Sequence, residues 1–174
     1  MIVQVNNFNK IAIIGISASG KSVLGRELAI KTGLPLIHMD NLFWKGNWQE
    51  IPEAEYLQKH QEIIQQDKWI IEGYIDEKMA DRLRRADLII YLDYPGWLCA
   101  LRLIQRWFSH RQQARPELPK EALEKFKYDT FWKVLTRKER IPTEKAVAMA
   151  GNRNIVRIKS PQGLRKFLEN FRVS

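Results

Sequence analysis

Cysteine is almost missing from this sequence, and so are long apolar runs. Cys99 is the single cysteine among 174 residues, which excludes a disulfide within the chain. We expect it to be a buried, unreactive thiol, because it lies in the apolar stretch 97–103. The longest apolar runs, such as 88–92, fall far short of the roughly 20 residues that span a membrane. Because the N-terminus does not resemble a signal or transit peptide, we expect a cytoplasmic protein.

Acidic residues are fewer than basic ones, and the imbalance is local. The formal net charge is +9, and residues 100–145 carry twelve lysines and arginines against six acidic residues. Such a segment attracts nucleotide phosphates and nucleic acid backbones alike, or it can be a solvated helix face. The sequence contains no helix-turn-helix, zinc-finger or RNP-like pattern. Nucleic acid therefore remains a possible partner without motif support.

Short apolar segments alternate with helical patterns along the whole chain. The segments typical of strands are 11–14, 36–39, 69–71, 88–92 and 155–158. The uninterrupted run at 88–92 is typical of a central parallel strand that helices cover on both faces. This alternation predicts one α/β domain over 1–174, with a doubly wound parallel sheet between helix layers. The polar stretch at about 109–119 is expected to form a loop or lid.

The strongest motif is the run Gly15–Ser22, which reads G-I-S-A-S-G-K-S between a predicted strand and a predicted helix. It matches the phosphate-binding pattern G-x-x-x-x-G-K-[ST] in the context that the pattern requires. Backbone N–H groups and the helix N-terminus would surround the phosphates, Lys21 would contact the β- and γ-phosphates, and Ser22 would bind Mg²⁺. The residues expected to hold ATP or another nucleoside triphosphate are Gly15, Ser17, Ala18, Ser19, Gly20, Lys21 and Ser22.

Three acidic residues end predicted strands, where ligands bind in sheets of this kind. Asp93 is placed to hold Mg²⁺, or to cap the helix that opens at Pro95. Asp40 is a catalytic candidate, because an aspartate there can orient or deprotonate an acceptor hydroxyl. Glu72 can bind the acceptor or cap a turn, and His38 fits a packed or capping role better than a catalytic one.

Arginines follow the fourth predicted strand. Arg111 and Arg115 are the catalytic lid candidates, because closing arginines can stabilise the charge that develops during phosphoryl transfer. Arg102 and Arg106 lie one turn apart on a predicted helix and can be simply solvated.

Together these motifs resemble the small P-loop kinases of the adenylate kinase and shikimate kinase type. Within that group the sequence is most similar to FlaR-type proteins, which are named as DNA topology modulation proteins but look like nucleotide kinases. The resemblance implies the sheet order 2-3-1-4-5 and a helical lid. It rests on Gly15–Ser22, His38-Met39-Asp40 with Phe43-Trp44, Trp69–Gly73, Leu92-Asp93-Tyr94-Pro95, and Arg111 with Arg115.

One departure from that pattern concerns the acceptor. Nucleoside monophosphate kinases hold the acceptor phosphate with arginines that follow strands two and three, yet residues 36–75 contain no arginine. A phosphorylated acceptor would lack bidentate partners unless Arg82, Arg84 or Arg85 turns inward. Asp40 resembles the acceptor-binding aspartate of shikimate kinases.

The sequence thus predicts an ATP-binding, Mg²⁺-dependent phosphotransferase that acts on an unidentified small molecule. The alternatives are a nucleic-acid-binding regulator of the topology modulation type with a P-loop ATPase, and a nucleotide-gated switch without an acceptor.

Overall fold

The computed structural model describes residues 3–4, 8–45, 49–110, 127–151 and 154–172. Five parallel strands form its central sheet, in the order β3-β6-β2-β7-β8. Counted among themselves along the chain, these strands have the order 2-3-1-4-5, as the resemblance implies. They are β3 (Leu36–His38), β6 (Trp69–Glu72), β2 (Lys10–Gly15), β7 (Leu88–Leu92) and β8 (Ile155–Ile158).

Strand β2 lies in the middle of the sheet and faces two separate hydrophobic cores. Ile11 and Ile13 belong to one core, whereas Ala12 and Ile14 belong to the other, and all four side chains are fully buried. Successive side chains of a strand point to opposite faces, so a continuous apolar run is what a strand covered on both sides requires. The predicted three-layer α/β/α architecture is confirmed.

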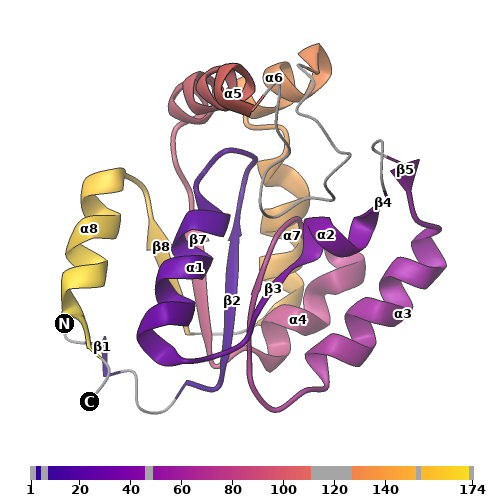
Figure 1. Ribbon diagram of the computed structural model, residues 1–174, viewed down its shortest axis with the longest axis vertical. Coiled ribbons are helices and arrows are strands. Elements are labelled where there is room, and N and C mark those ends of the chain that lie inside the picture. Colours follow the sequence, from indigo (N-terminus) through magenta and orange to yellow (C-terminus); the bar gives the residue numbers. More distant parts are fainter. Residues whose placement is uncertain (1–2, 5–7, 46–48, 111–126, 152–153, 173–174) are drawn as a thin grey trace.

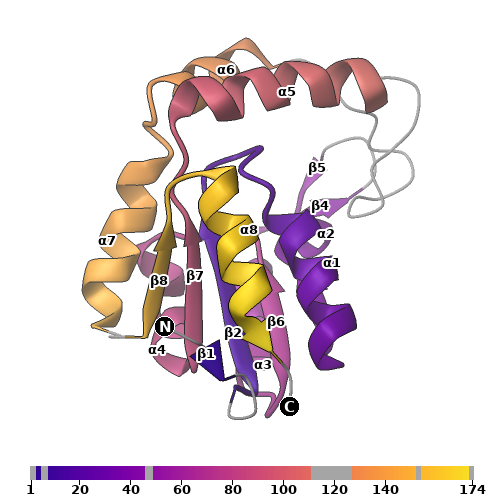
Figure 2. The same ribbon diagram turned by 90° about the vertical axis from the view of Figure 1, so that its left-hand side faces the viewer.

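Helices cover both faces of the sheet and also cross its upper edge (Figures 1 and 2). On one face lie α1 (Lys21–Thr32) and α8 (Pro161–Asn170), and on the other α3 (Glu53–Ile64), α4 (Ala80–Arg85) and α7 (Arg140–Ala150). Two further helices, α5 (Gly96–His110) and α6 (Tyr128–Leu135), lie across the carboxyl ends of the strands (Figure 2). These two helices therefore form a roof over the edge where the phosphate-binding motif Gly15–Ser22, called the P-loop below, lies.

The two roof helices meet in a close contact at Gly96. A Cβ atom at this position would lie 2.3 Å from the backbone oxygen of Leu135 and 2.7 Å from that of Val134. Only glycine permits the start of α5 to meet the end of α6 this closely. The contact fixes α6 and the segment after it relative to β7.

Smaller elements complete the fold. They are α2 (Met39–Phe43), the antiparallel pair β4 (Trp44–Lys45) and β5 (Gln49–Glu50), the 3₁₀ turn η2 (Glu77–Met79), and the parallel pair β1 (Val3–Gln4) and β9 (Phe171–Arg172). The second strand ends at His38 rather than at Met39, because Met39 begins α2. Nowhere in the described ranges is a helix both long and apolar enough to cross a membrane.

Candidate active site

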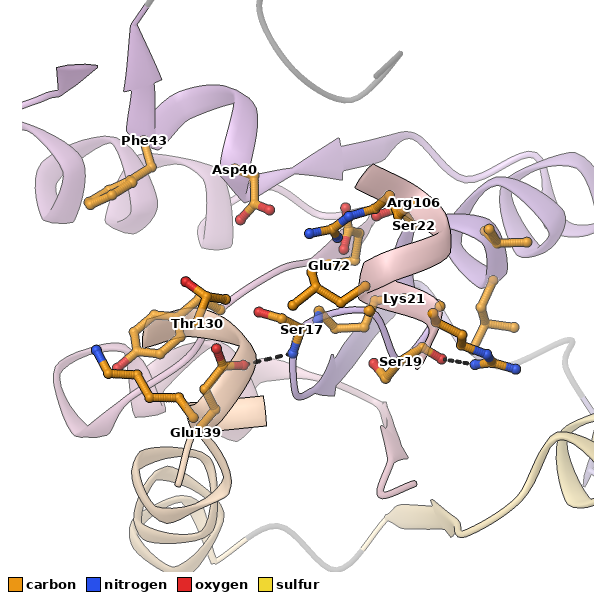
Figure 3. A pocket seen from close by; sticks show the side chains of 18 of the residues that line it. Ser17, Ser19, Lys21, Ser22, Asp40, Phe43, Glu72, Arg106, Thr130 and Glu139 are labelled. Atoms are coloured by element: carbon orange, nitrogen blue, oxygen red, sulfur yellow. Dashed lines mark hydrogen bonds between the residues drawn. The ribbon is translucent and has the colours of Figure 1, made fainter. Parts of the chain in front are cut away.

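One cavity of about 880 Å³ lies at the carboxyl edge of the sheet, beneath the roof helices. Its lining combines the P-loop with residues from α2, α3, the end of β6, α5 and α6. Figure 3 shows Asp40 and Phe43 on one side, Thr130 and Glu139 on the other, and Lys21 between them. Segments distant in the sequence thus meet at the edge where ligands bind in α/β folds.

Two glycines of the P-loop adopt positive φ angles, which other residues rarely adopt. Gly15 has φ 149°, and a Cβ there would lie 2.6 Å from the backbone oxygen of Leu92 in the neighbouring strand. Gly20 has φ 99° and precedes the first residue of α1. No acidic residue occupies the first turn of α1. The positive end of the helix dipole is therefore not neutralised within its own first turn, which favours an anionic ligand.

Two P-loop side chains fit a phosphate ligand. Lys21 Nζ donates a hydrogen bond to the backbone oxygen of Ile16 at 3.0 Å, so the ammonium group lies against the loop. Ser19 is fully buried, and its hydroxyl has no partner among the described residues. A buried polar atom without a partner is costly unless a ligand or water satisfies it.

A carboxylate also contacts the loop from the roof side. The backbone N–H of Ser17 donates to Glu139 Oε2 at 2.8 Å (Figure 3). Glu139 directly precedes α7 and is 122 residues away in sequence. Nothing in the local sequence pattern marks Glu139, because the contact depends on how α6 is fixed over the sheet.

Glu72 lies much closer to the P-loop than its position in the sequence suggests. Strand β6 pairs directly with β2, with Glu72 in register with Ile13. The carboxylate is almost fully buried and binds His38 Nδ1 at 2.5 Å, and the nearby Ser22 side chain helps to lower its pKa. Burial by itself would raise the pKa of Glu72, but the hydrogen bond from His38 and the charge of Lys21 lower it overall. Glu72 is thus held ionised beside Lys21 and Ser22.

Asp40 and two aromatic residues form the wall opposite the roof. Asp40 projects from α2 into the cavity (Figure 3). Phe43, one turn further along, packs edge to face against Tyr56, with ring centroids 5.2 Å apart. The position of Asp40 agrees with the predicted role toward an acceptor, which itself stays a prediction.

Asp93 lies outside the cavity lining, within an ion-pair cluster. Its nearly buried carboxylate contacts three guanidinium groups: Arg137, Arg140 at 3.1 Å and Arg157 at 3.3 Å. The predicted metal role is not tested by this arrangement. The contacts themselves show Asp93 joining the α6–α7 connection to β7 and β8.

The two roof arginines that the sequence left open as solvated lie at the site. Arg102 donates to the backbone oxygen of Ser19 at 3.1 Å, and its guanidinium lies 5.2 Å from the centre of the Tyr94 ring. Arg106 lines the cavity (Figure 3). The predicted lid residues Arg111 and Arg115 lie outside the described residues, as does nearly all of the stretch 109–119.

Of the three arginines considered for an acceptor phosphate, one turns inward. Arg82 is fully buried and donates from Nη2 to the backbone oxygen of Tyr74 at 2.6 Å. Burial lowers the pKa of its guanidinium. Arg84 instead pairs with Asp81 on the exposed side of α4. Arg82 does not line the cavity but lies behind the wall that Tyr74 forms.

Comparison of the sequence with protein-family models gives no match, and comparison with curated proteins gives none either. Comparison of the structure with solved structures does give matches. An unliganded sugar kinase from a Janibacter species superposes with a TM-score of 0.54 at 15% identity, covering 92% of each chain.

Two shikimate kinases are similar in the same way. The enzyme from Acinetobacter baumannii, in complex with shikimate, gives a TM-score of 0.57 at 15% identity, covering 94% of this chain and 91% of that one. The enzyme from Bacteroides thetaiotaomicron gives 0.56 at 15% identity, covering 93% and 95%. The fold is therefore the P-loop fold of shikimate kinases. At this level of identity the likeness establishes the fold and not the substrate.

Proposed function

We propose that this protein is an ATP-dependent, Mg²⁺-requiring phosphotransferase that acts on a hydroxyl group of a small molecule. The observation that carries the proposal is the shared cavity, in which the P-loop and Asp40 face the same space. A nucleotide switch needs only the phosphate loop, whereas transfer needs room for a second substrate beside the γ-phosphate. A cavity of about 880 Å³ provides that room.

The nucleotide half of the site consists of the P-loop and the roof. Lys21 and the N-terminus of α1 would bind the β- and γ-phosphates, and Arg106 would contact them from above. In this proposal Arg111 and Arg115 keep their role as lid arginines.

The oxygen ligands at Ser22 and Glu72 fit Mg²⁺, which binds few protein groups and retains several waters. When bound, the ion would offset charge on the β- and γ-phosphate oxygens. Glu72 is the better carboxylate for this role than Asp93, since it alone of the two lines the cavity.

In the half of the cavity that would bind the second substrate, Asp40 is the group that would accept a proton. Asp40 would take the proton of the acceptor hydroxyl while the hydroxyl oxygen bonds to the γ-phosphorus. The bond between that phosphorus and the β,γ-bridging oxygen breaks, and ADP leaves. Because the roof helices cover the site, bulk water would compete poorly with the acceptor.

The nucleic-acid-binding alternative has no specific support in the described part of the chain. Of the basic segment 100–145, Arg102, Arg106, Lys127 and Lys133 line the cavity. Arg137 and Arg140 bind Asp93 instead. Of these six described basic residues, four therefore line the cavity and two are paired with a carboxylate. A topology modulation role of the FlaR type stays a prediction from the sequence.

The test compares Lys21→Met with Lys31→Met, an exposed lysine at the other end of the same helix. ADP release with ATP and Mg²⁺ would be followed across nucleoside monophosphates, nucleosides and small hydroxyl compounds. We expect Lys21→Met to lower acceptor-dependent release by at least about 100-fold, with an unchanged circular dichroism spectrum, and Lys31→Met to have no effect. A wild-type protein that binds ATP but releases ADP at the same slow rate with every acceptor would indicate a switch. One that does not bind ATP would refute the proposal.

A further inference from the structure

The two ends of the cavity carry opposite charges. Around the P-loop and the roof, the basic residues that line it are Lys21, Arg102, Arg106, Lys127 and Lys133, and they outnumber the acidic residues Glu27 and Glu139. At the end formed by α2, β5, α3 and the segment after β6, the acidic residues that line it are Asp40, Glu50, Glu53 and Asp76, whereas Glu72 lies beside the P-loop. The basic end suits a triphosphate. We call the other the acidic end, and it is where the acceptor of the proposed reaction would bind.

Among the described residues, few positive charges lie near the acidic end. Lys78 is the one lysine among the described lining residues there, and it pairs with Glu53. His38 is bound to Glu72. Arg82 is fully buried behind the wall, where Nη2 donates to the backbone oxygen of Tyr74 while Nε and Nη1 have no hydrogen-bond partner among the described residues. An anionic acceptor would therefore meet mainly carboxylates there, which disfavours a phosphate or carboxylate group.

The carboxylates are spread along the wall rather than gathered at one point. Within the described ranges, no group of three or more acidic, histidine or cysteine side chains is arranged to hold a metal ion. Asp40 comes from α2, Glu53 from α3 and Asp76 from the residue before η2. Groups spaced in this way contact different parts of a bound organic molecule.

Aromatic side chains stand among these carboxylates. Phe43 and Tyr56 form the edge-to-face pair on the wall, and Tyr74 lines the same end with 48% of its surface exposed. Aromatic faces combined with carboxylates are the chemistry that binds an ammonium group, through cation–π attraction and charge-assisted hydrogen bonds.

We infer that the acceptor is a small hydroxyl compound that carries an ammonium group, such as an amino sugar or an amino alcohol. This inference rests on the proposed phosphotransferase function and names its substrate class. Asp40 would contact the reacting hydroxyl. The other carboxylates of the acidic end, Glu50, Glu53 and Asp76, would hold the ammonium group together with the aromatic rings, away from the basic end.

The experiment uses acceptors in matched sets with one carbon framework and different charge. One set is glucosamine, glucose and glucuronate, and another is ethanolamine, ethylene glycol and glycolate. Phosphorylated product would be measured by mass spectrometry after incubation of the full chain with ATP and Mg²⁺. We expect the ammonium member to have a kcat/KM at least 10-fold above the neutral member of its set, and the anionic member to be the poorest.

A substitution at Asp76 tests whether the acidic end causes the preference for ammonium acceptors. Asp76→Asn keeps the oxygen that accepts from the backbone N–H of Lys78 at 3.0 Å but removes the charge. We expect it to raise KM for the ammonium acceptor about 3- to 10-fold, with KM for the neutral acceptor and for ATP unchanged. Asp67→Asn, an exposed position outside the cavity lining, is the matched control.

The outcomes separate this inference from the proposed function. If transfer depends on Lys21 but favours neutral or anionic members, the acceptor class is wrong and the phosphotransferase stands. If ATP is bound and no ammonium member is phosphorylated, the acceptor class is likewise refuted. If ATP is not bound at all, both proposals fail.

Discussion

Glu139 and Ser17 are joined by a hydrogen bond of 2.8 Å, from a P-loop backbone N–H to a carboxylate oxygen. The N–H groups of such loops bind phosphate oxygens, and here one of them holds an anionic side chain. A nucleotide whose phosphates use this N–H must displace Glu139. After its displacement, the Glu139 carboxylate would still lie near those phosphates and repel them.

We therefore expect Glu139→Gln to tighten the binding of a non-hydrolysable ATP analogue about 3- to 10-fold, as measured by calorimetry. The amide keeps the size of the side chain and removes the negative charge. Glu62→Gln, at an exposed position on α3, should leave the affinity unchanged. Weaker binding in Glu139→Gln would mean that this carboxylate supports the loop and does not compete with the ligand.

We expect substitutions of Glu72 and Asp93 to affect the Mg²⁺ dependence of activity differently. For Glu72→Gln we predict a 10- to 100-fold higher Mg²⁺ concentration at half-maximal activity, because the variant removes the ionised carboxylate beside Ser22. Nucleotide binding without the metal should change little. A Mg²⁺ titration of the ADP-release rate makes the measurement, and an unchanged midpoint would exclude Glu72 from the metal site.

For Asp93→Asn we predict a loss of stability rather than a loss of metal dependence. The substitution leaves Arg137, Arg140 and Arg157 without their shared nearly buried carboxylate. Breaking such a cluster should cost about 2–4 kcal/mol, somewhat less than the roughly 3–5 kcal/mol of a fully buried pair, because the arginines are partly exposed. Urea unfolding gives the stability, and a shifted Mg²⁺ midpoint in this variant would restore Asp93 as a metal ligand.

His60 predicts a pH dependence of stability. Its side chain is fully buried on α3, and neither ring nitrogen has a partner among the described residues. Burial, with a further contribution from the charge of Arg82, lowers the pKa of His60 to about 4. The unfolded chain binds the proton near pH 6.5, so below that pH protonation favours the unfolded state. Between pH 7 and pH 5 this residue should cost the folded state about 2 kcal/mol.

In the variant His60→Leu, the loss of stability between pH 7 and pH 5 that is due to this histidine should disappear. Urea unfolding of both proteins at pH 7 and pH 5 provides the comparison. The wild type should lose more stability than the variant on going to pH 5. Equal losses would show that His60 is not the group that titrates.

The sheet was predictable from the sequence because its strands are locally encoded. Runs such as Leu88–Leu92 are apolar at every position, and only a strand covered on both faces needs that pattern. The P-loop was equally readable, since its glycines, Lys21 and Ser22 act within eight consecutive residues. The strand order that the resemblance implies also places the third strand, which ends at Glu72, against the first, but the nearness of Glu72 to Ser22 on α1 was not predicted.

What the sequence alone determined is therefore the P-loop side of the cavity, whose conformation depends on neighbours in the chain. Tertiary structure decided the other contacts, because they join segments that no local pattern relates. Glu139 reaches Ser17 across 122 residues, Arg102 reaches Ser19 across 83, and three arginines converge on Asp93. Such contacts depend on how the roof helices pack over the sheet, and this packing is set by buried side chains and by close approaches such as that of Gly96 to Leu135.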